Sequence, residues 1–483
     1  FNPQRQGHTA MSKQEICGWT ATEMAQRIRD KEVSCLEVMQ SHLQQIEQIN
    51  PTVNAIITLL PERAIEGARA ADDAIARGDD LGPLHGLPIA HKDLVPTKGI
   101  RTTYGSPIYA DEIPNEDGLI VERLRQGGAI TIGKTNVPEF GAGSQTFNEV
   151  FGATLNPYDM TKTCGGSSGG AAVSLACRML PIADGSDTGG SLRNPANFCN
   201  VVGFRNSPGR VPVWPSDIGW FPISVQGAMG RTVEDVALQL TAIAGPDDRH
   251  PISIREPGSI FAAPLERDFR DVKIAWSPSF GDLPVDERVS SVIEAQRSTF
   301  ESLGCQVEEA LPDFRDADEV FKVWRAWRFA IGYQQLIKTN RDQIKDTVIW
   351  NTEEGLKLTG LDLSQAEVKR TSLYHRVREF MQEYEYLILP VNQVPPFDVN
   401  QPYIEEINGV AMETYIDWMK SCYYITVTGL PAISVPCGFT PEGLPVGVQI
   451  VGRHQQDFGV LQLAYAFQQA TRFADQKPPL LAQ

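Results

Sequence analysis

Short runs of isoleucine, valine and leucine constrain the fold of this chain more than any other feature. Four of them stand in its second half: "VKIAWS" (272–277), "EYLILPV" (385–391), "PAISVPC" (431–437) and "PVGVQIVG" (445–452). They show little polar–apolar alternation, which is typical of strands covered on both faces. From about residue 85, other short apolar runs alternate with glycine turns and helical stretches. The pattern predicts an α/β fold, with a large mixed β-sheet core covered by helices on both faces.

The N-terminal region, about residues 20–80, has a helical pattern instead. Thr20 and Ser34 are each followed three residues later by glutamate, which is the capping-box pattern of a helix start. Asn50-Pro51 predicts the end of the second helix, because the residue before a proline disfavours helical backbone. A third helix is expected over residues 61–78.

Charge and composition exclude several classes of partner. The chain has 483 residues, with 43 Lys and Arg against 60 Asp and Glu, so its formal net charge is −17. Such a charge argues against nucleic acid and against an anionic membrane surface as the main partner. There is no apolar run of membrane-spanning length and no secretory signal, so we expect a cytoplasmic protein. Residues 1–10 lack periodicity and are interpreted as a leader or a remnant added for expression.

The cysteines and histidines do not form a metal-binding pattern. The eight cysteines are scattered without a C-x-x-C pair, which favours reduced thiols over a disulfide framework. The seven histidines include no H-E-x-x-H and no cluster at zinc spacing. We therefore expect no metal and no organic cofactor.

The loop "KTCGGSSGGAAVSLA" (162–176) allows three interpretations. A phosphate-binding loop would need a lysine after its glycines, and none follows. Gly165 to Gly169 also fit the G-x-S-x-G nucleophile elbow, for which His375 and His454 are the candidate bases. A flexible linker is disfavoured, because an apolar run and a second glycine-serine turn, "GSDTGGSLR" (185–193), follow closely.

The second turn completes a set of motifs that resembles the amidase signature family. Lys92 in "GLPIAHKDL", Ser167 in "GGSSGG" and Ser191 in "SDTGGSLR" match that family in order and spacing. The similarity continues through "GKTNVPEFGAGS" (133–144), "GFRNSPGRVP" (203–212) and "GLPAISVPCGFTPEGLPVGVQIVGR" (429–453). It implies one amidase signature domain over residues 11–483. Within it we expect a helical N-terminal region (about 20–80), a catalytic core (about 85–250), a helical, aromatic-rich insert (about 310–380) and C-terminal strands (about 385–453).

The resemblance also implies how the three residues cleave an amide. Ser191 corresponds to the nucleophile, Ser167 to a bridging serine preceded by a cis peptide, and Lys92 to the base. A lysine serves as a base only when it is neutral, and an exposed ammonium has a pKa near 10.4. Lys92 must therefore be buried or otherwise perturbed, and its apolar flanks, Ile89-Ala90 and Leu94-Val95, are suited to desolvate it.

Further residues receive roles from the resemblance. Backbone N–H groups of the turn at the nucleophile are expected to form the oxyanion hole, and two upstream glycines to line the acyl site. Hydrogen bonds from polar neighbours are expected to hold the loops. The oxyanion residues are Thr188, Gly189 and Gly190 with Ser191; the lining glycines are Gly141 and Gly143; the supporting residues are Ser168, Asp187 and Arg193.

Met419 indicates the kind of amide. The A subunit of glutamyl-tRNA amidotransferase, a member of the family, carries an acidic residue upstream of its "GLP" turn to hold the amino group of glutamine. Met419 stands at that place here, with Trp418, Tyr423 and Tyr424 nearby. We therefore expect a pocket for apolar or aryl amides, and a small-molecule substrate. Esters and carbamates, a role as that amidotransferase component, an inactive binding protein of the same fold and a homodimer stay open as alternatives.

Overall fold

The computed structural model describes residues 13–482, and its centre is an eight-stranded sheet. The strand order is β12-β11-β13-β17-β16-β9-β10-β8, in which β12, β11 and β13 run parallel and every other pair is antiparallel. The strands are β8 (Ile182–Asp187), β9 (Val202–Arg205), β10 (Val225–Gly230), β11 (Lys273–Trp276), β12 (Gln306–Glu309), β13 (Tyr386–Pro390), β16 (Ala432–Phe439) and β17 (Pro445–Gly452). The four strands predicted in the second half of the chain all belong to this sheet, which confirms the α/β prediction. The leader or remnant interpreted at residues 1–10 lies outside the described residues.

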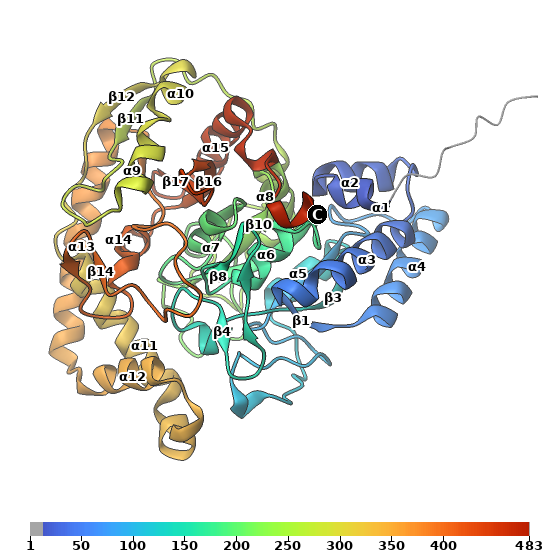
Figure 1. The fold of residues 1–483 in the computed structure, drawn as a ribbon, viewed down its shortest axis with the longest axis horizontal. Coiled ribbons are helices and arrows are strands. Elements are labelled where there is room, and N and C mark those ends of the chain that lie inside the picture. The colour runs from blue at the N-terminus through green and yellow to red at the C-terminus, as the bar shows by residue number, and fades with distance from the viewer. Residues whose placement is uncertain (1–12, 483) are drawn as a thin grey trace, which may run out of the picture.

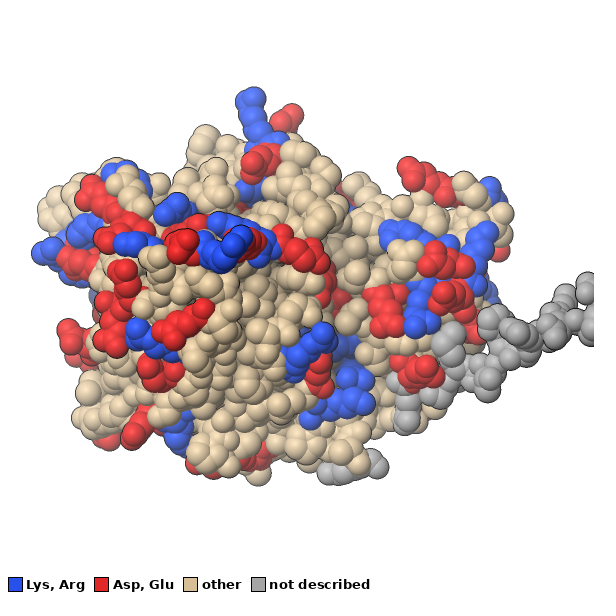
Figure 2. Space-filling view, turned by 90° about the horizontal axis from the view of Figure 1, so that it is seen from above, with Lys and Arg blue, Asp and Glu red and all other residues tan. Residues whose placement is uncertain are grey.

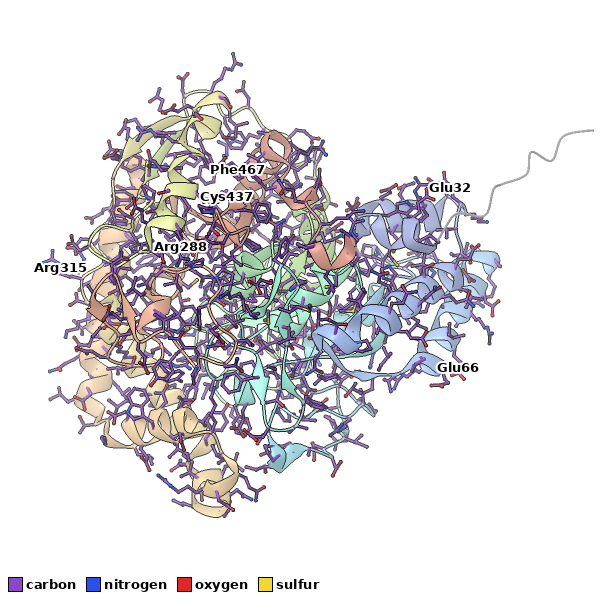
Figure 3. The ribbon with its side chains drawn as sticks, in the orientation of Figure 1. Glu32, Glu66, Arg288, Arg315, Cys437 and Phe467 are labelled. Atoms are coloured by element: carbon purple, nitrogen blue, oxygen red, sulfur yellow. The ribbon has the colours of Figure 1, made fainter. Side chains whose placement is uncertain are left out.

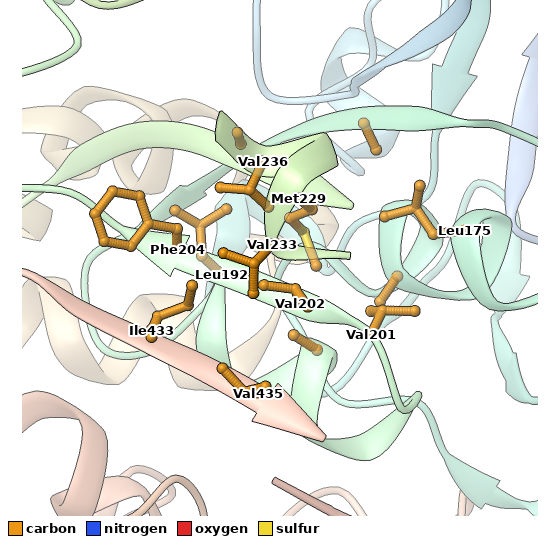
Figure 4. Packing of buried hydrophobic residues seen from close by; sticks show 14 of the residues in the cluster. Leu175, Leu192, Val201, Val202, Phe204, Met229, Val233, Val236, Ile433 and Val435 are labelled. Atoms are coloured by element: carbon orange, nitrogen blue, oxygen red, sulfur yellow. The ribbon is translucent and has the colours of Figure 1, made fainter. Parts of the chain in front are cut away.

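Helices pack against both faces of the sheet. Gly203 of β9 faces α7, where a side chain would collide with the Leu192 carbonyl, whereas its neighbours Val202 and Phe204 point to the other face. That other face carries α8 and α15, which also contact each other. The helices are α6 (Gly169–Ala176), α7 (Arg193–Phe198), α8 (Val233–Ile243), α9 (Glu287–Glu294), α10 (Arg297–Ser302) and α15 (Asp457–Thr471). Figure 4 shows Val233 and Val236 of α8 above Val202 in this core.

A second, three-stranded sheet lies beside the first. Its order is β1-β3-β2, with β2 (Pro88–Lys92) parallel to β3 (Ile130–Thr135) and β1 (Ile56–Leu59) antiparallel to β3. Strand β2 runs next to β8 without belonging to its ladder. The sequence prediction of one large sheet did not separate these strands, because the pairing of a strand depends on its neighbours in space.

The N-terminal helices form the blue part of Figure 1. They are α1 (Lys13–Gly18), α2 (Ala21–Arg29), α3 (Cys35–Val53), α4 (Pro61–Arg77) and α5 (Leu119–Gln126). Ser34 forms the predicted capping box, but at Thr20 only the threonine half of the box is present, because the Glu23 carboxylate pairs with Arg27 instead. The predicted helix end at Asn50-Pro51 is wrong. Pro51 lies in the last turn of α3, where it forgoes a single hydrogen bond, and the helix ends at Val53 with Asn54 as its C-cap.

Three further helices occupy the orange region at the lower left of Figure 1, as the aromatic-rich segment predicts. They are α11 (Ala317–Asn340), α12 (Asp346–Lys357) and α13 (Gly360–Glu383). Helix α11 packs on α12, α13 and α14 (Lys420–Thr428). The remaining strands pair in short hairpins: β4 (Phe147–Asn148) with β5 (Gly152–Ala153), β6 (Leu155–Asn156) with β7 (Asp159–Thr163), and β14 (Glu406–Ile407) with β15 (Val410–Ala411).

Charges of both signs cover the surface. Figure 2 shows Lys and Arg interspersed with Asp and Glu over the face that it displays. In Figure 3, Glu32 of the turn between α2 and α3 and Glu66 of α4 project outward, whereas Cys437 and Phe467 lie in the buried interior. All eight cysteines of the chain are buried and free. Across residues 13–482, no helix combines the length and apolar character needed to cross a membrane.

Candidate active site

Three segments that are distant in sequence meet at Lys92. The lysine is the last residue of β2, and the backbone N–H of Lys92 donates to the Asp184 carboxylate of β8, which fixes the two strands side by side. Its Nζ lies 2.9 Å from Ser167 Oγ and 2.8 Å from Ser168 Oγ, in the loop before α6. It also lies 2.9 Å from Ser186 Oγ of β8. An ammonium has three donors, and three hydroxyls surround this one.

Burial perturbs the titration of Lys92. The side chain has no solvent exposure, and desolvation lowers the pKa of Lys92 to about 7, against the opposing attraction of Asp187 and Asp184. A substantial fraction of the amine is therefore neutral near pH 7. Asp93, the next residue, turns away and accepts hydrogen bonds from Thr103.

Ser167 and Ser191 lie on adjoining loops. The peptide bond between Gly166 and Ser167 is cis, and the Ser168 N–H donates to the Ser191 carbonyl at 3.3 Å. Ser191 follows β8 and precedes α7. Both serines line one cavity, so a molecule bound there would reach the two hydroxyls.

The turn before Ser191 presents backbone N–H groups. Gly190 has a φ of 120°, which favours glycine, and a Cβ there would collide with Cys422. The Gly190 N–H donates to Asp187 Oδ1 at 3.0 Å, so it is already engaged within the protein. Among the described residues, the N–H groups of Thr188, Gly189 and Ser191 have no hydrogen-bond acceptor. This corrects the expectation for Gly190, whose contribution is its conformation rather than a free donor.

A buried ion-pair network holds this turn. Asp187 pairs with Arg193 at 3.0 Å and with Arg205 at 3.1 Å, and all three side chains are inaccessible to solvent. Burial alone would raise the pKa of Asp187, but the two guanidinium groups lower it below its usual range. Arg193 also donates to the Cys422 carbonyl and to Gln449, which ties the turn to α14 and β17. The sequence analysis assigned no role to Ser186 or Arg205, although both lie in the quoted motifs, because their partners Lys92 and Asp187 are set by the tertiary structure.

The cavity beside the two serines has a volume of about 600 Å³. It is lined by the two serines and by five other predicted residues: Gly141, Gly143, Thr188, Gly189 and Met419. Gly141 has a φ of 69°, and a Cβ there would meet Leu94 and approach Ser167 Oγ, so the position requires glycine.

Aromatic rings form much of the wall, although not all of the expected ones. The aromatic residues that line the cavity include Tyr104, Tyr109, Phe140, Phe221 and Tyr333. Three expected rings pack elsewhere: Trp418 lies against Phe198 and Phe397, Tyr423 stacks on Phe321, and Tyr424 contacts Phe280 and Phe314. Of residues 417–424, Met419 alone lines the cavity.

The two histidines that were candidate bases for a nucleophile elbow do not lie at this site. His375 and His454 both contact the ring of Tyr374, and neither lines the cavity at Ser167. Within residues 13–482, no group of three or more His, Cys, Asp or Glu side chains is arranged to hold a metal ion.

Comparisons with known proteins identify the family of this chain. The family model described as Amidase matches residues 37–461. An acylamidase of Rhodococcus erythropolis is 35% identical over 473 residues, covering 97% of this chain and 98% of that protein. The A subunit of glutamyl-tRNA(Gln) amidotransferase from Geobacillus stearothermophilus is 34% identical, covering 95% of this chain and 99% of that protein. The crystal structure of a bacterial aryl acylamidase superposes with a TM-score of 0.89 at 28% identity, covering 95% and 98% of the two chains.

The fold and these similarities together define an amide-hydrolysing enzyme. The chain belongs to the amidase signature family, as the motifs around Lys92, Ser167 and Ser191 predict.

Proposed function

We propose that the enzyme hydrolyses apolar or aryl carboxamides by itself, through an acyl-enzyme on Ser191, with Ser167 as proton relay and Lys92 as base. One observation carries this proposal: a fully buried lysine contacts Ser167 at 2.9 Å, in a site that opens on a cavity shared with Ser191. Esters and carbamates are substrates for the same chemistry, because they form the same kind of acyl-enzyme.

Acylation begins with neutral Lys92. In that state two N–H groups donate to Ser168 and Ser186, and the nitrogen lone pair accepts the proton of Ser167. Ser167 Oγ in turn accepts the proton of Ser191 as the Ser191 oxygen attacks the carbonyl carbon. The leaving amine then takes a proton from Ser167, which is restored from the Lys92 ammonium. Water repeats the sequence to release the acid.

The oxyanion forms beside the turn that precedes Ser191. The N–H groups of Thr188, Gly189 and Ser191 are the donors that we assign to it, since the Gly190 N–H is bonded to Asp187. The network of Asp187 with Arg193 and Arg205 keeps these donors in place before the substrate arrives. Preorganised donors of this kind are worth about 2.7–4 kcal/mol each in related chemistry.

The surroundings of Met419 favour a stand-alone amidase over an amidotransferase component. Met419 supplies an apolar side chain to the cavity beside Gly189. The neighbouring acid, Asp417, is buried in an ion pair with Lys322 at 2.7 Å and does not line the cavity. An inactive binding protein is the weaker alternative, because the lysine and both serines are present and within reach of one cavity.

Glutamine is therefore expected to be a poor substrate. Its ammonium would lie near Met419 without an acidic partner, and an unpaired charge in an apolar site is costly. We expect kcat/KM for an acyl anilide to exceed that for glutamine by at least about 100-fold on the isolated chain, given a penalty of roughly 3 kcal/mol. Met419→Asp is expected to raise KM for apolar amides.

Met160→Asp is the matched control for that variant, because Met160 is exposed on β7, outside the cavity. A preference for glutamine, or activity that requires a second protein chain, would favour the amidotransferase alternative. A screen of chromogenic anilides, aliphatic amides, glutamine and carbamates makes the comparison directly.

The pKa of Lys92 predicts the pH profile. With the pKa at about 7, the ammonium predominates below that pH and cannot accept the Ser167 proton. Log kcat/KM for a neutral anilide should rise by one unit per pH unit on the acid side, bend near pH 7 and then level off. A profile without a bend between about pH 5 and 9 would contradict Lys92 as the base.

A further inference from the structure

Arg325 of α11 lies in the wall of the cavity and is almost buried, at 5% exposure. Its Nε donates to Asn351 Oδ1 at 3.0 Å, and its Nη2 donates to the Tyr415 hydroxyl at 2.7 Å. The guanidinium carbon lies 4.6 Å from the ring centroid of Phe329. These neighbours orient the guanidinium, but none of them carries a negative charge.

The other buried arginines differ from Arg325 in this respect. Arg193 and Arg205 pair with Asp187, Arg210 pairs with Asp457, and Arg231 lies in the field of Asp235. Arg325 forms no salt bridge within residues 13–482. Burying an unpaired charge is costly, so a guanidinium in this position needs a counter-charge from elsewhere.

The free edge of Arg325 is accessible from the cavity. Its Nη1 has no hydrogen-bond partner among the described residues. This nitrogen is not among the buried, unpartnered polar atoms, so it retains some accessible surface. Arg328, three residues further along α11, also lines the cavity without a salt bridge to any described residue. The cavity wall, as far as the structure describes it, contains one carboxylate, that of Asp217, which is exposed. In a chain with a net charge of −17, this wall is locally cationic.

Arg325 lies one helical turn beyond a residue that contacts the turn before Ser191. Phe321, one turn before Arg325, lies against Gly189, since a Cβ on Gly189 would be 3.0 Å from the Phe321 ring. Four residues advance a helix by about 6 Å. Arg325 thus begins one helical turn from the residue that contacts the turn before Ser191, and Arg325 and that turn line the same cavity.

We propose that Arg325, assisted by Arg328, binds a carboxylate of the substrate, so that the preferred substrates are amides with a carboxylate on an apolar or aryl body. Two N–H groups of a guanidinium match the two oxygens of a carboxylate. The aromatic wall formed by Tyr109, Phe140 and Tyr333 suits the body of such a molecule. The inference rests on the proposed function and adds a substrate class to it. Glutamine also carries a carboxylate, but it stays a poor substrate because its ammonium would have no buried acidic partner in this cavity.

The test compares pairs of substrates that differ in one charge. The first pair, 4-carbamoylbenzoate and terephthalamide, places the variable group on the acyl side. The second pair, 4-acetamidobenzoate and 4-acetamidobenzamide, places it on the leaving group. We expect kcat/KM to favour the carboxylate in at least one pair by about 10-fold to 100-fold, mainly through KM, as for a hydrogen bond to a charged group.

Variants assign the preference to Arg325. Arg325→Met should remove most of this preference, measured as the ratio of kcat/KM within each pair, and Arg325→Lys should keep part of it. Arg328→Met should reduce it less. Arg270→Met is the matched control, because Arg270 is 82% exposed and paired with Asp268, and it should change nothing.

Two outcomes would overturn the inference: no carboxylate preference in either pair, or a preference that Arg325→Met retains. If Arg325→Met folds poorly, two other measurements test the proposal. They are the carboxylate preference of Arg328→Met and the competitive inhibition constants of benzoate and benzamide with the native enzyme. Weaker inhibition by benzoate than by benzamide would count against the proposal. Hydrolysis of neutral anilides tests the proposed function separately, since it persists if only the carboxylate site is absent.

Discussion

Replacement of Ser191 by alanine is expected to lower kcat for an acyl anilide by about 10⁴-fold or more, the usual cost of removing a nucleophile. The variant should also lose all labelling by an active-site-directed fluorophosphonate. The physical reason is that Ser191 lies on the turn whose Thr188 and Gly189 N–H groups are free to stabilise the oxyanion. Ser167 and Ser168 both contact Lys92, which suits them to proton transfer rather than to attack.

Mass spectrometry of the labelled native enzyme locates the adduct. We expect it on Ser191, and we expect His375→Ala and His454→Ala to retain most activity, because both rings contact Tyr374 outside the cavity. An adduct on Ser167 or Ser168 alone would restore the nucleophile-elbow interpretation.

Replacement of Lys92 by alanine should lower kcat by about 10²–10⁴-fold, which is the contribution of a positioned general base. Without the amine, the Ser167 proton has no acceptor, and Ser167 cannot take the proton of Ser191. The remaining rate should also lose the bend near pH 7, because the group whose pKa is about 7 has been removed.

Lys92→Arg separates the base from the positive charge. Arginine keeps the charge but does not give up its proton at working pH, so this variant should be as inactive as Lys92→Ala. Circular dichroism and a melting curve establish whether both variants are folded. Near-normal turnover by folded Lys92→Ala at neutral pH would require a different base.

Much of the architecture follows from local patterns. The runs at 272–277, 385–391, 431–437 and 445–452 became strands within one residue or two of their predicted bounds, because dense Ile, Val and Leu allow few other environments. The motifs around Lys92, Ser167 and Ser191 likewise identified the family, as the comparisons confirm.

Local patterns were insufficient where two options differ by little free energy. Pro51 looked like a helix end, but a proline in a last turn removes one hydrogen bond at most. Glu23 satisfied the capping pattern, yet Arg27 one turn later competes for its carboxylate. The sequence placed the rings of Trp418, Tyr423 and Tyr424 near the pocket without distinguishing among them. In the structure all three pack against other aromatic residues instead.

The sequence by itself determined the α/β class, the family and the residues that can carry the chemistry, because these depend on residue type, order and spacing. Only the tertiary structure decided the electrostatics of the site. The pKa of Lys92 depends on burial between β2 and β8, and the engagement of the Gly190 N–H depends on Asp187. Arg325 has no acidic partner among the described residues, and this follows from which side chains pack beside α11. Each of these properties varies with distances between residues far apart in the chain, and no local pattern records such distances.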